Sequence, residues 1–248
     1  MTQTRGAIIV GASSGIGEAL ARQLADEGYE IGLAARRTER MREIGNELPT
    51  KSYVATMDVT DTEDARAGFF ELAEAMESVD LVVLNAGVGP FNPKLDWEAE
   101  RRAIDVNVRG FVALATAAME YFETVGREDH SSELDGHLVG ISSVAAHFGG
   151  GGVQAYCASK AFVSTYLEGL RARQRGADSN VSITTVEPGY VDTELSMGDF
   201  WECSPETAAK QIARAIRKGK NHVYVTRRWR LVAWALDLTP DWLLRRLL

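Results

Sequence analysis

Short runs of apolar residues alternate along the chain with longer segments in which apolar residues recur every three or four positions. A short continuous apolar run is typical of a strand buried on both faces, and the longer period is that of a helix. Strands that alternate with helices predict a parallel sheet covered by helices on both faces. We therefore expect an α/β fold with a doubly wound, seven-stranded parallel sheet.

The predicted strands cover residues 6–10, 30–34, 52–56, 79–84, 137–142, 181–187 and 222–226. The predicted helices cover residues 15–28, 38–47, 61–77, 97–125, 154–175, 205–218 and 228–247. Residues 126–136 are polar and predict a surface loop. Because no internal repeat or low-complexity linker divides the sequence, we expect residues 1–248 to form a single domain with an apolar helical segment at 228–248.

A glycine-rich turn joins the first predicted strand to the first predicted helix, with the sequence GASSGIG at residues 11–17. A strand, a glycine turn and a helix N-terminus in that order can bind an anion, because the unpaired N–H groups of the helix face it and glycine lets it approach the backbone. The spacing G-x-x-x-G-x-G differs from the commonest dinucleotide fingerprint. An ordinary glycine-rich βα turn is the alternative.

Tyr156 and Lys160 stand four residues apart, and Ser143 precedes the tyrosine by thirteen residues. Positions i and i+4 share one face of a helix, so the phenol and the ammonium can point into one site. A nearby cation lowers the pKa of a tyrosine from about 10 toward the range useful for proton transfer. By itself the pair also fits an ordinary helix with one solvated lysine.

Composition agrees with an enzyme that carries one large core, since the chain has 248 residues and 45% hydrophobic content. The net charge of −8 argues against nucleic-acid binding, which needs a basic patch. Two cysteines, Cys157 and Cys203, are too few for a disulfide framework and indicate reduced thiols in a cytoplasmic protein. We expect Cys157 to be a packing residue.

The four histidines show no metal-ligand spacing, so we expect no metal site and assign the histidines to solvated or capping positions: His130, His137, His147 and His222. The first apolar run is too short for a signal peptide and continues into the glycine turn. The sequence also lacks the run of about 20 apolar residues that a membrane-spanning helix needs.

Taken together, the motifs resemble those of the short-chain dehydrogenase/reductase family, in its single-domain branch of about this length. The resemblance extends from Gly6 to about Val225 and rests on motifs in the family's order: Gly11-x-x-x-Gly15-x-Gly17, Asp58-Val59, Asn85-Ala86-Gly87, Asn107, Ser143, Tyr156-x-x-x-Lys160, and Pro188-Gly189 followed by Thr193. One departure is Val10, where the family usually has threonine. The resemblance implies a Rossmann-like fold and hydride transfer between a nicotinamide and a carbonyl or alcohol substrate.

The resemblance also assigns catalytic roles. It implies that Tyr156 is the general acid in carbonyl reduction, and that Lys160 lowers the pKa of Tyr156 and binds the nicotinamide ribose. Ser143 would donate to the substrate oxygen; Ser142 competes for this role, but the thirteen-residue offset to the tyrosine matches the family at Ser143. Asn107 would hold a water for proton relay, with a structural asparagine in a long helix as the alternative.

Cofactor preference is implied by the end of the second predicted strand, where NAD-preferring relatives usually carry an acidic residue and this chain has Ala35 followed by Arg36 and Arg37. The family pattern implies NADP(H), with NAD(H) less favoured. Arg36 would be the leading ligand of the 2′-phosphate and Arg37 its helper, unless both only begin the next helix as solvated charge. The other residues expected at the cofactor are Gly11, Ser13, Ser14, Gly15, Ile16, Gly17, Asp58, Val59, Asn85, Ala86, Gly87, Tyr156, Lys160, Pro188, Gly189, Val191 and Thr193.

Residues 194–204 are predicted to form a lid over the substrate. Five aromatic residues fall near the expected mouth and favour an apolar aldehyde or ketone, unless they serve core packing: Phe91, Phe148, Tyr190, Phe200 and Trp201. The alternative function is a catalytically silent NADP(H)-binding redox-sensing regulator, which would not need to keep the catalytic set. A sugar-nucleotide epimerase usually needs a larger C-terminal region.

The C-terminal segment is apolar almost all round at residues 229–236, and five arginines flank its three tryptophans. Thr239 and Pro240 predict the N-cap and first turn of a last short helix. The segment fits a subunit contact, a core-packing tail or an interfacial helix on a membrane. We expect a homodimer or homotetramer, with peripheral membrane contact as the least favoured alternative.

Overall fold

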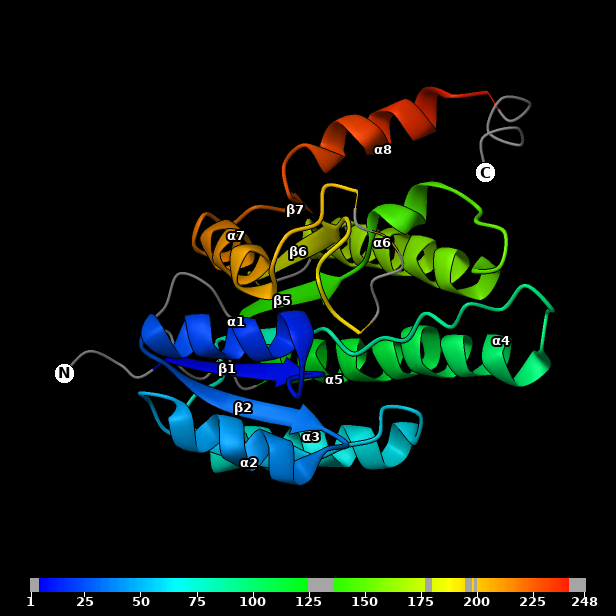
Figure 1. Ribbon diagram of the computed structural model, residues 1–248. Coiled ribbons are helices and arrows are strands. Elements are labelled where there is room, and N and C mark those ends of the chain that lie inside the picture. The colour runs from blue at the N-terminus through cyan, green and yellow to red at the C-terminus, as the bar shows by residue number, and fades with distance from the viewer. Residues whose placement is uncertain (1–4, 125–135, 177–179, 195–197, 199, 241–248) are drawn as a thin grey trace.

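The computed structural model describes residues 5–124, 136–176, 180–194, 198 and 200–240. Within them a seven-stranded sheet has the order β3-β2-β1-β4-β5-β6-β7, and every pair of neighbouring strands is parallel. This confirms the predicted doubly wound α/β fold (Figure 1). The strands are β1 (Arg5–Val10), β2 (Tyr29–Ala35), β3 (Ser52–Thr56), β4 (Leu81–Leu84), β5 (Gly136–Ile141), β6 (Val181–Pro188) and β7 (His222–Val225).

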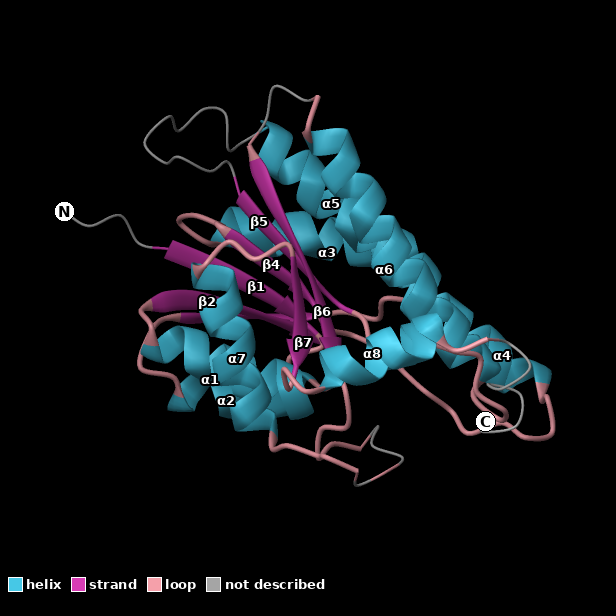
Figure 2. Cartoon of the chain, turned by 90° about the horizontal axis from the view of Figure 1, so that it is seen from above, coloured by secondary structure: helices cyan, strands magenta, loops and turns pink. Residues whose placement is uncertain are grey.

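Helices cover both faces of this sheet, as Figure 2 shows from above. Helices α1, α2 and α7 supply buried residues to the core on one face, and α3, α5 and α6 supply them to the core on the other. The helices are α1 (Gly15–Asp26), α2 (Thr38–Glu47), α3 (Thr62–Ala75), α4 (Trp97–Ile104), α5 (Phe111–Thr124), α6 (Gln154–Gln174), α7 (Pro205–Arg217) and α8 (Trp229–Leu238). Two short elements join them: the π-helical turn η1 (Asp105–Gly110) and the 3-10 helix η2 (Val144–His147).

Strand β1 illustrates why the strands are continuous apolar runs. Ala7 and Ile9 point into the core beneath α1 and α7, while Ile8 and Val10 point into the core beneath α3 and α5. Successive side chains of a strand face opposite sides of the sheet, so a strand covered on both sides needs apolar residues at every position.

Two predicted helices differ from the observed ones. The segment expected to be one helix at 97–125 is interrupted by η1, a widened turn of the kind often found at functional sites. At the C-terminal end, α8 stops at Leu238, and Thr239 caps its C-terminus by donating its N–H to the carbonyl of Leu236 at 3.1 Å. Thr239 precedes a proline, which disfavours helical backbone there. The rest of the predicted C-terminal helices, at 241–248, and the predicted loop at 126–135 lie outside the described residues.

The parallel arrangement brings the carboxyl ends of the strands to one edge of the sheet, where α/β proteins bind their ligands. The segments after β1, β4, β5 and β6 begin at Gly11, Asn85, Ser142 and Gly189, so the predicted motifs meet at this edge. In the part of the chain that the structure describes, no helix is both long enough and apolar enough to cross a bilayer.

Candidate active site

Two adjoining cavities lie at the carboxyl edge of the sheet. The first has a volume of about 420 Å³ and is bordered by the glycine turn, the end of β2 and the segments after β3 and β4. The second, of about 570 Å³, is bordered by Ser143, Tyr156 and Lys160. Four residues line both cavities, which makes them one continuous groove: Ile16, Asn85, Gly87 and Thr193.

The glycine turn is held close to the segment after β4. Gly11 has a φ of +86°, and a Cβ atom added to it would lie 2.6 Å from the backbone nitrogen of Ala86. A Cβ atom on Gly17 would lie 2.1 Å from the carbonyl oxygen of Gly11. The side-chain amide of Asn85 donates to that same oxygen at 2.9 Å. Only glycine fits both positions, and the turn that leads into the N-terminus of α1 lines the first cavity.

The replacement of the family's usual threonine by Val10 leaves the turn tethered through the backbone. The N–H of Gly11 donates to the carbonyl of Ala34 at 2.7 Å, and the N–H of Asn85 donates to the carbonyl of Val10 at 2.9 Å. Val10 itself is buried between the strands, where an apolar side chain is well placed.

The two arginines after β2 behave differently. Arg36 is exposed and borders the first cavity. Arg37 donates from Nε to Ser13 Oγ at 3.1 Å and from Nη2 to Ser14 Oγ at 2.6 Å. Its Nη1 lies 3.7 Å from Oε1 of Glu194. Arg37 therefore braces the glycine turn, and both arginines border the first cavity.

Asp58 and Val59 also border the first cavity. Oδ1 of Asp58 accepts from the N–H of Thr60 at 3.0 Å and from its hydroxyl at 2.8 Å. The backbone N–H of Thr60 is the main reason why the pKa of Asp58 lies below its ordinary value. The carboxylate is thus fixed in place and ionised at neutral pH.

Ser143 and Tyr156 meet in the second cavity. Ser143 follows β5 and begins η2, where its Oγ accepts from the N–H of Ala145 at 3.1 Å. Ser143 and Tyr156 both border this cavity, and Ser143 lies close enough to the phenol to act on it and lower its pKa. The hydroxyl of Ser142 instead donates to the carbonyl of Lys160 at 2.8 Å. Of the two adjacent serines, it is thus Ser143 that acts on the phenol.

Lys160 lies beneath the ring of Tyr156, with its Nζ 5.8 Å from the ring centroid. This ammonium donates to the carbonyl of Ile141 at 2.9 Å, and burial lowers the pKa of Lys160 to about 8. Burial also raises the pKa of Tyr156, an effect that Ser143 only partly offsets. The net pKa of Tyr156 is thus raised, because burial of the phenol dominates, and a lowering effect of Lys160 on the phenol stays a prediction.

Asn107 lies in the π-helical turn and is 1% exposed. Its amide donates to the carbonyl of Val88 at 2.8 Å and to Ser159 Oγ at 2.9 Å, while its Oδ1 accepts from the N–H of Val88 at 2.9 Å. Asn107 thus anchors the segment after β4 to α6, as the structural alternative predicts. A carbonyl oxygen accepts two hydrogen bonds, so this Oδ1 still has room for a water, and the relay role stays a prediction.

The segment after β6 closes the groove from the other side. The N–H of Gly189 donates to the carbonyl of Val225 at 2.7 Å, and Val191 is buried and pairs with Cys203. Thr193 reaches across to the glycine turn, so that a Cβ atom on Gly15 would lie 2.9 Å from its methyl group. Within the predicted lid, residues 195–197 and 199 lie outside the described residues.

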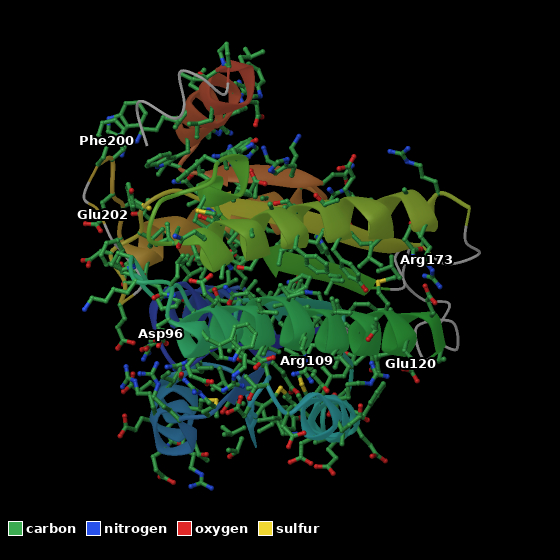
Figure 3. All side chains as sticks on the ribbon, turned by 90° about the vertical axis from the view of Figure 1, so that its right-hand side faces the viewer. Asp96, Arg109, Glu120, Arg173, Phe200 and Glu202 are labelled. Carbon is green, nitrogen blue, oxygen red and sulfur yellow. The ribbon has the colours of Figure 1, made fainter. Side chains whose placement is uncertain are left out.

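The aromatic residues divide into two groups. Phe91, Phe148 and Tyr190 border the second cavity, as predicted for the mouth. Phe200 and Trp201 pack edge-on against Trp229, with ring centroids 6.0 and 6.1 Å away. Phe200 lies at the same end of the molecule as Asp96, opposite Glu120 and Arg173 (Figure 3).

Trp229, in the first turn of α8, is among the residues of the second cavity that the sequence analysis missed. It is 6% exposed, and a Cβ atom on Gly189 would lie 2.0 Å from its indole. The apolar C-terminal segment was a signal that some tryptophan is buried. Nothing in its pattern indicated which one faces the cavity, because the segment is apolar almost all round.

The histidines are not all solvated or capping, which corrects the prediction. His137 is buried and hydrogen-bonds Thr184 at 2.8 Å, and burial lowers its pKa to about 4. His147 and His222 both contact Glu187. Among the described residues, no three His, Cys, Asp or Glu side chains form a group that could hold a metal ion. Cys157 is buried, and burial raises the pKa of its thiol.

The geometry suits two chemical tasks. The first cavity offers backbone N–H groups, serine hydroxyls and guanidinium groups, which bind phosphates. The second offers two neighbouring hydroxyls, those of Ser143 and Tyr156, in largely apolar surroundings. Such a pair can hold a carbonyl oxygen and transfer a proton to it.

Comparison with known proteins gives a consistent result. Residues 5–202 match the model of the family described as short chain dehydrogenase. An oxidoreductase of Myxococcus xanthus, described as uncharacterized, is 38% identical over 197 residues, which cover 77% of this chain and 74% of the relative. Serine 3-dehydrogenase of Rhizobium radiobacter is 30% identical over 196 residues, which cover 77% of this chain and 73% of that relative. Among solved structures, a short chain dehydrogenase from Burkholderia cenocepacia in complex with NADP has a TM-score of 0.82 at 24% identity. The match covers 99% of this chain and 98% of that structure.

Proposed function

The chain belongs to the short-chain dehydrogenase family of oxidoreductases, and from this premise we propose that it transfers a hydride between NADP(H) and a carbonyl or alcohol group. The observation that carries the proposal is that Ser143 and Tyr156 lie together in a cavity that continues into the glycine-turn groove. When bound, the nicotinamide would supply or accept the hydride.

Proton transfer would fall to Tyr156. In the reducing direction its hydroxyl donates a proton to the oxygen that becomes an alkoxide, and the Ser143 hydroxyl donates a hydrogen bond to the same oxygen. Lys160, with a pKa of about 8, is mostly protonated at neutral pH. Its positive charge stabilises the phenolate that forms as the proton leaves, and it would also bind the nicotinamide ribose.

Preference for NADP(H) over NAD(H) is proposed from the groups around the adenosine end of the first cavity. Ala35 offers no carboxylate to accept hydrogen bonds from a 2′-hydroxyl or to repel a 2′-phosphate. Ser13, Ser14 and the guanidinium of Arg36 line the same cavity, and Arg37 is hydrogen-bonded to both serines. Two cations and two hydroxyls form a site for the phosphate that distinguishes NADP.

An apolar aldehyde or ketone is the substrate class that the second cavity favours. Apolar and aromatic side chains make up most of its wall, and Lys160 is the one charged side chain among the described residues that border it. The name of the Rhizobium relative indicates serine as its substrate. A substrate with a carboxylate needs a cationic partner. Because we assign Lys160 to the nicotinamide ribose, we do not extend serine oxidation to this chain.

We also propose that the protein is a homo-oligomer in the cytoplasm and that its two cysteines are reduced. Leu231, Trp234 and Leu238 of α8 are 61%, 53% and 83% exposed, which favours a subunit contact. Both cysteines are free thiols. The regulatory alternative has no support, since a silent sensor would not need the Ser143–Tyr156 pair.

The decisive experiment is an NADPH-consumption assay with a panel of aliphatic and aromatic aldehydes and ketones. We expect turnover of apolar carbonyls by the wild-type protein and none by Tyr156→Phe. NADPH binding without turnover of any panel member by either protein would contradict the enzymatic function. Turnover of charged keto acids in preference to apolar carbonyls would contradict the substrate class.

A further inference from the structure

A buried carboxylate lies at the centre of a polar cluster outside the proposed catalytic set. Glu187 is 1% exposed and immediately precedes Pro188 at the end of β6. Its oxygens lie 2.8 Å from His147 Nε2, 3.1 Å from His222 Nε2 and 2.7 Å from Ser164 Oγ. Burial disfavours its charge, but these hydrogen bonds lower the pKa of Glu187 to about 2. The group is therefore an ionised carboxylate inside the protein.

His147 is held between two carboxylates. Its Nε2 lies 2.8 Å from Oε2 of Glu187, and its Nδ1 lies 2.8 Å from Oδ1 of Asp237. An ionised carboxylate only accepts hydrogen bonds, and a neutral imidazole has only one N–H. Both bonds can therefore exist together only when the ring carries two protons. The same two partners, Glu187 first, raise the pKa of His147 to about 9.

This ion triad joins three elements around the second cavity. Glu187 belongs to β6, His147 ends the short helix that Ser143 begins, and Asp237 lies in the last turn of α8. Helix α8 packs on η2 and β7 and otherwise stands apart from the sheet (Figure 1). Ten residues of α8 thus have two fixed points, Trp229 at the first turn and Asp237 at the last.

We propose that His147 is a positioning residue that clamps α8 to the body of the protein, so that Trp229 stays packed on Gly189 as a wall of the substrate cavity. The part of this inference that concerns substrate rests on the proposed function. Asp237 lies eight residues along α8 from Trp229, so the triad acts on Trp229 through the placement of the helix. Loss of the clamp should therefore change how a substrate fits before it changes the chemistry at Tyr156.

The other titratable and charged groups around His147 do not link Glu187 to the carboxylate on α8. Tyr224 and His222 approach from β7, Arg230 from α8, and Arg171 from α6 acts electrostatically on Glu187. Burial raises the pKa of Tyr224 to about 12, so this phenol stays neutral well beyond the range in which His147 titrates. His222 contacts Glu187 and lies in β7, whereas His147 also contacts the carboxylate on α8.

The clamp should respond to pH in one direction. The pKa of His147 is raised from 6.5 to about 9, so the stabilisation is complete below about pH 6.5 and is lost as the pH rises through about 9. The neutral ring keeps one N–H and can hold only one of the two carboxylates. We expect the partly exposed Asp237 to be released, because the buried Glu187 cannot be left without partners.

Hydrogen–deuterium exchange of residues 229–238 in the intact, ligand-free protein tests the clamp without any assay of turnover. After correction for intrinsic rates, exchange of this helix should be slow at pH 7 and rise about threefold to tenfold at pH 10. His147→Gln and Asp237→Ala should show the fast exchange already at pH 7, with no further rise. Asp237→Ala leaves the buried Glu187–His147 contact in place, so it tests the clamp even where His147→Gln fails to fold.

His222→Gln is the matched control, because it removes a histidine from the same carboxylate without touching α8. It should keep slow exchange at pH 7 and the rise at pH 10. Wild-type protection of residues 229–238 in Asp237→Ala at pH 7 would overturn the proposal, as would equal loss of protection in His222→Gln.

Kinetics provide the second readout. For a bulky aromatic ketone, Asp237→Ala should raise KM about fivefold, while kcat for a small aliphatic carbonyl changes less than twofold. A uniform fall in kcat for both substrates would overturn the positioning role. If no carbonyl is turned over by the wild-type protein, the proposed function fails, and the exchange experiment still decides whether the clamp exists.

Discussion

Ser143 and Tyr156 lie together in one cavity, where Ser143 acts to lower the pKa of the phenol, although the serine follows a strand and the tyrosine stands in the first turn of a helix. Both groups face the apolar end of a groove whose other end is built from glycine backbone and arginine. A carbonyl oxygen placed between these two hydroxyls would receive a hydrogen bond from one and a proton from the other. The relationship makes the roles of the two residues separable by mutation.

Tyr156→Phe should lower kcat for carbonyl reduction more than about a hundredfold and leave the Kd of NADPH nearly unchanged, because only the transferable proton is lost. Steady-state kinetics and NADPH fluorescence titration measure the two quantities. Tyr166→Phe, on the same helix but packed against Phe111 and Phe162, is the control and should keep wild-type turnover. Near wild-type turnover in Tyr156→Phe would remove Tyr156 from the mechanism.

Arg36→Ala should weaken NADPH binding about 10- to 100-fold and leave NADH binding unchanged, because a charge-assisted contact to the 2′-phosphate is lost. Arg37→Ala should weaken both cofactors, since Arg37 braces Ser13 and Ser14 of the glycine turn. Isothermal titration with each cofactor distinguishes the two effects. Adding Ala35→Asp to Arg36→Ala should shift preference toward NADH. Equal use of NADH and NADPH by the wild-type protein would refute the assignment.

Lys160→Met should abolish activity and raise the free energy of unfolding at pH 7 by about 2 kcal/mol. Lowering the pKa of Lys160 from 10.5 to about 8 corresponds to about 3 kcal/mol, and the lost hydrogen bond to Ile141 offsets about 1 kcal/mol of that gain. The unfolded chain binds more protons between pH 8 and 10.5, so the wild-type protein should regain stability over this range and the advantage of the variant should shrink. Urea denaturation at pH 7 and pH 10 measures the free energy of unfolding of the wild-type protein and of the variant. A variant less stable than wild type at pH 7 would show that burying the Lys160 charge does not destabilise the fold.

Replacing Leu231, Trp234 and Leu238 together by serine should convert the proposed oligomer to a monomer in light scattering without lowering the free energy of unfolding. These side chains are exposed on α8, whereas Trp229 and Ala233 of the same helix are buried. Flotation of the wild-type protein with anionic vesicles tests the membrane alternative, because Arg228 and Arg230 lie over Trp201 and Trp234. If the variant keeps the oligomeric state of the wild type and the wild type does not float with vesicles, the exposed face of α8 has neither of the two interaction roles.

The sequence by itself determined the sheet, its helices and the edge at which the motifs meet. Strands covered on both faces must be apolar at every position, so runs such as Ala7 to Val10 were visible without a structure. The ends of parallel strands share one edge, and Gly11, Asn85, Ser143 and Gly189 follow four of these strands, so their proximity also followed from order along the chain.

Only the tertiary structure decided how these groups act on one another. Whether Lys160 or burial governs the pKa of Tyr156 depends on how many side chains surround the phenol, and spacing along a helix does not record that number. His147 meets Glu187 and Asp237 at separations of 40 and 90 residues along the chain, which no local pattern signals. Helix α8 is apolar almost all round, so its period could not indicate that Trp229 faces the cavity; contacts with η2 and β7 fix its orientation instead.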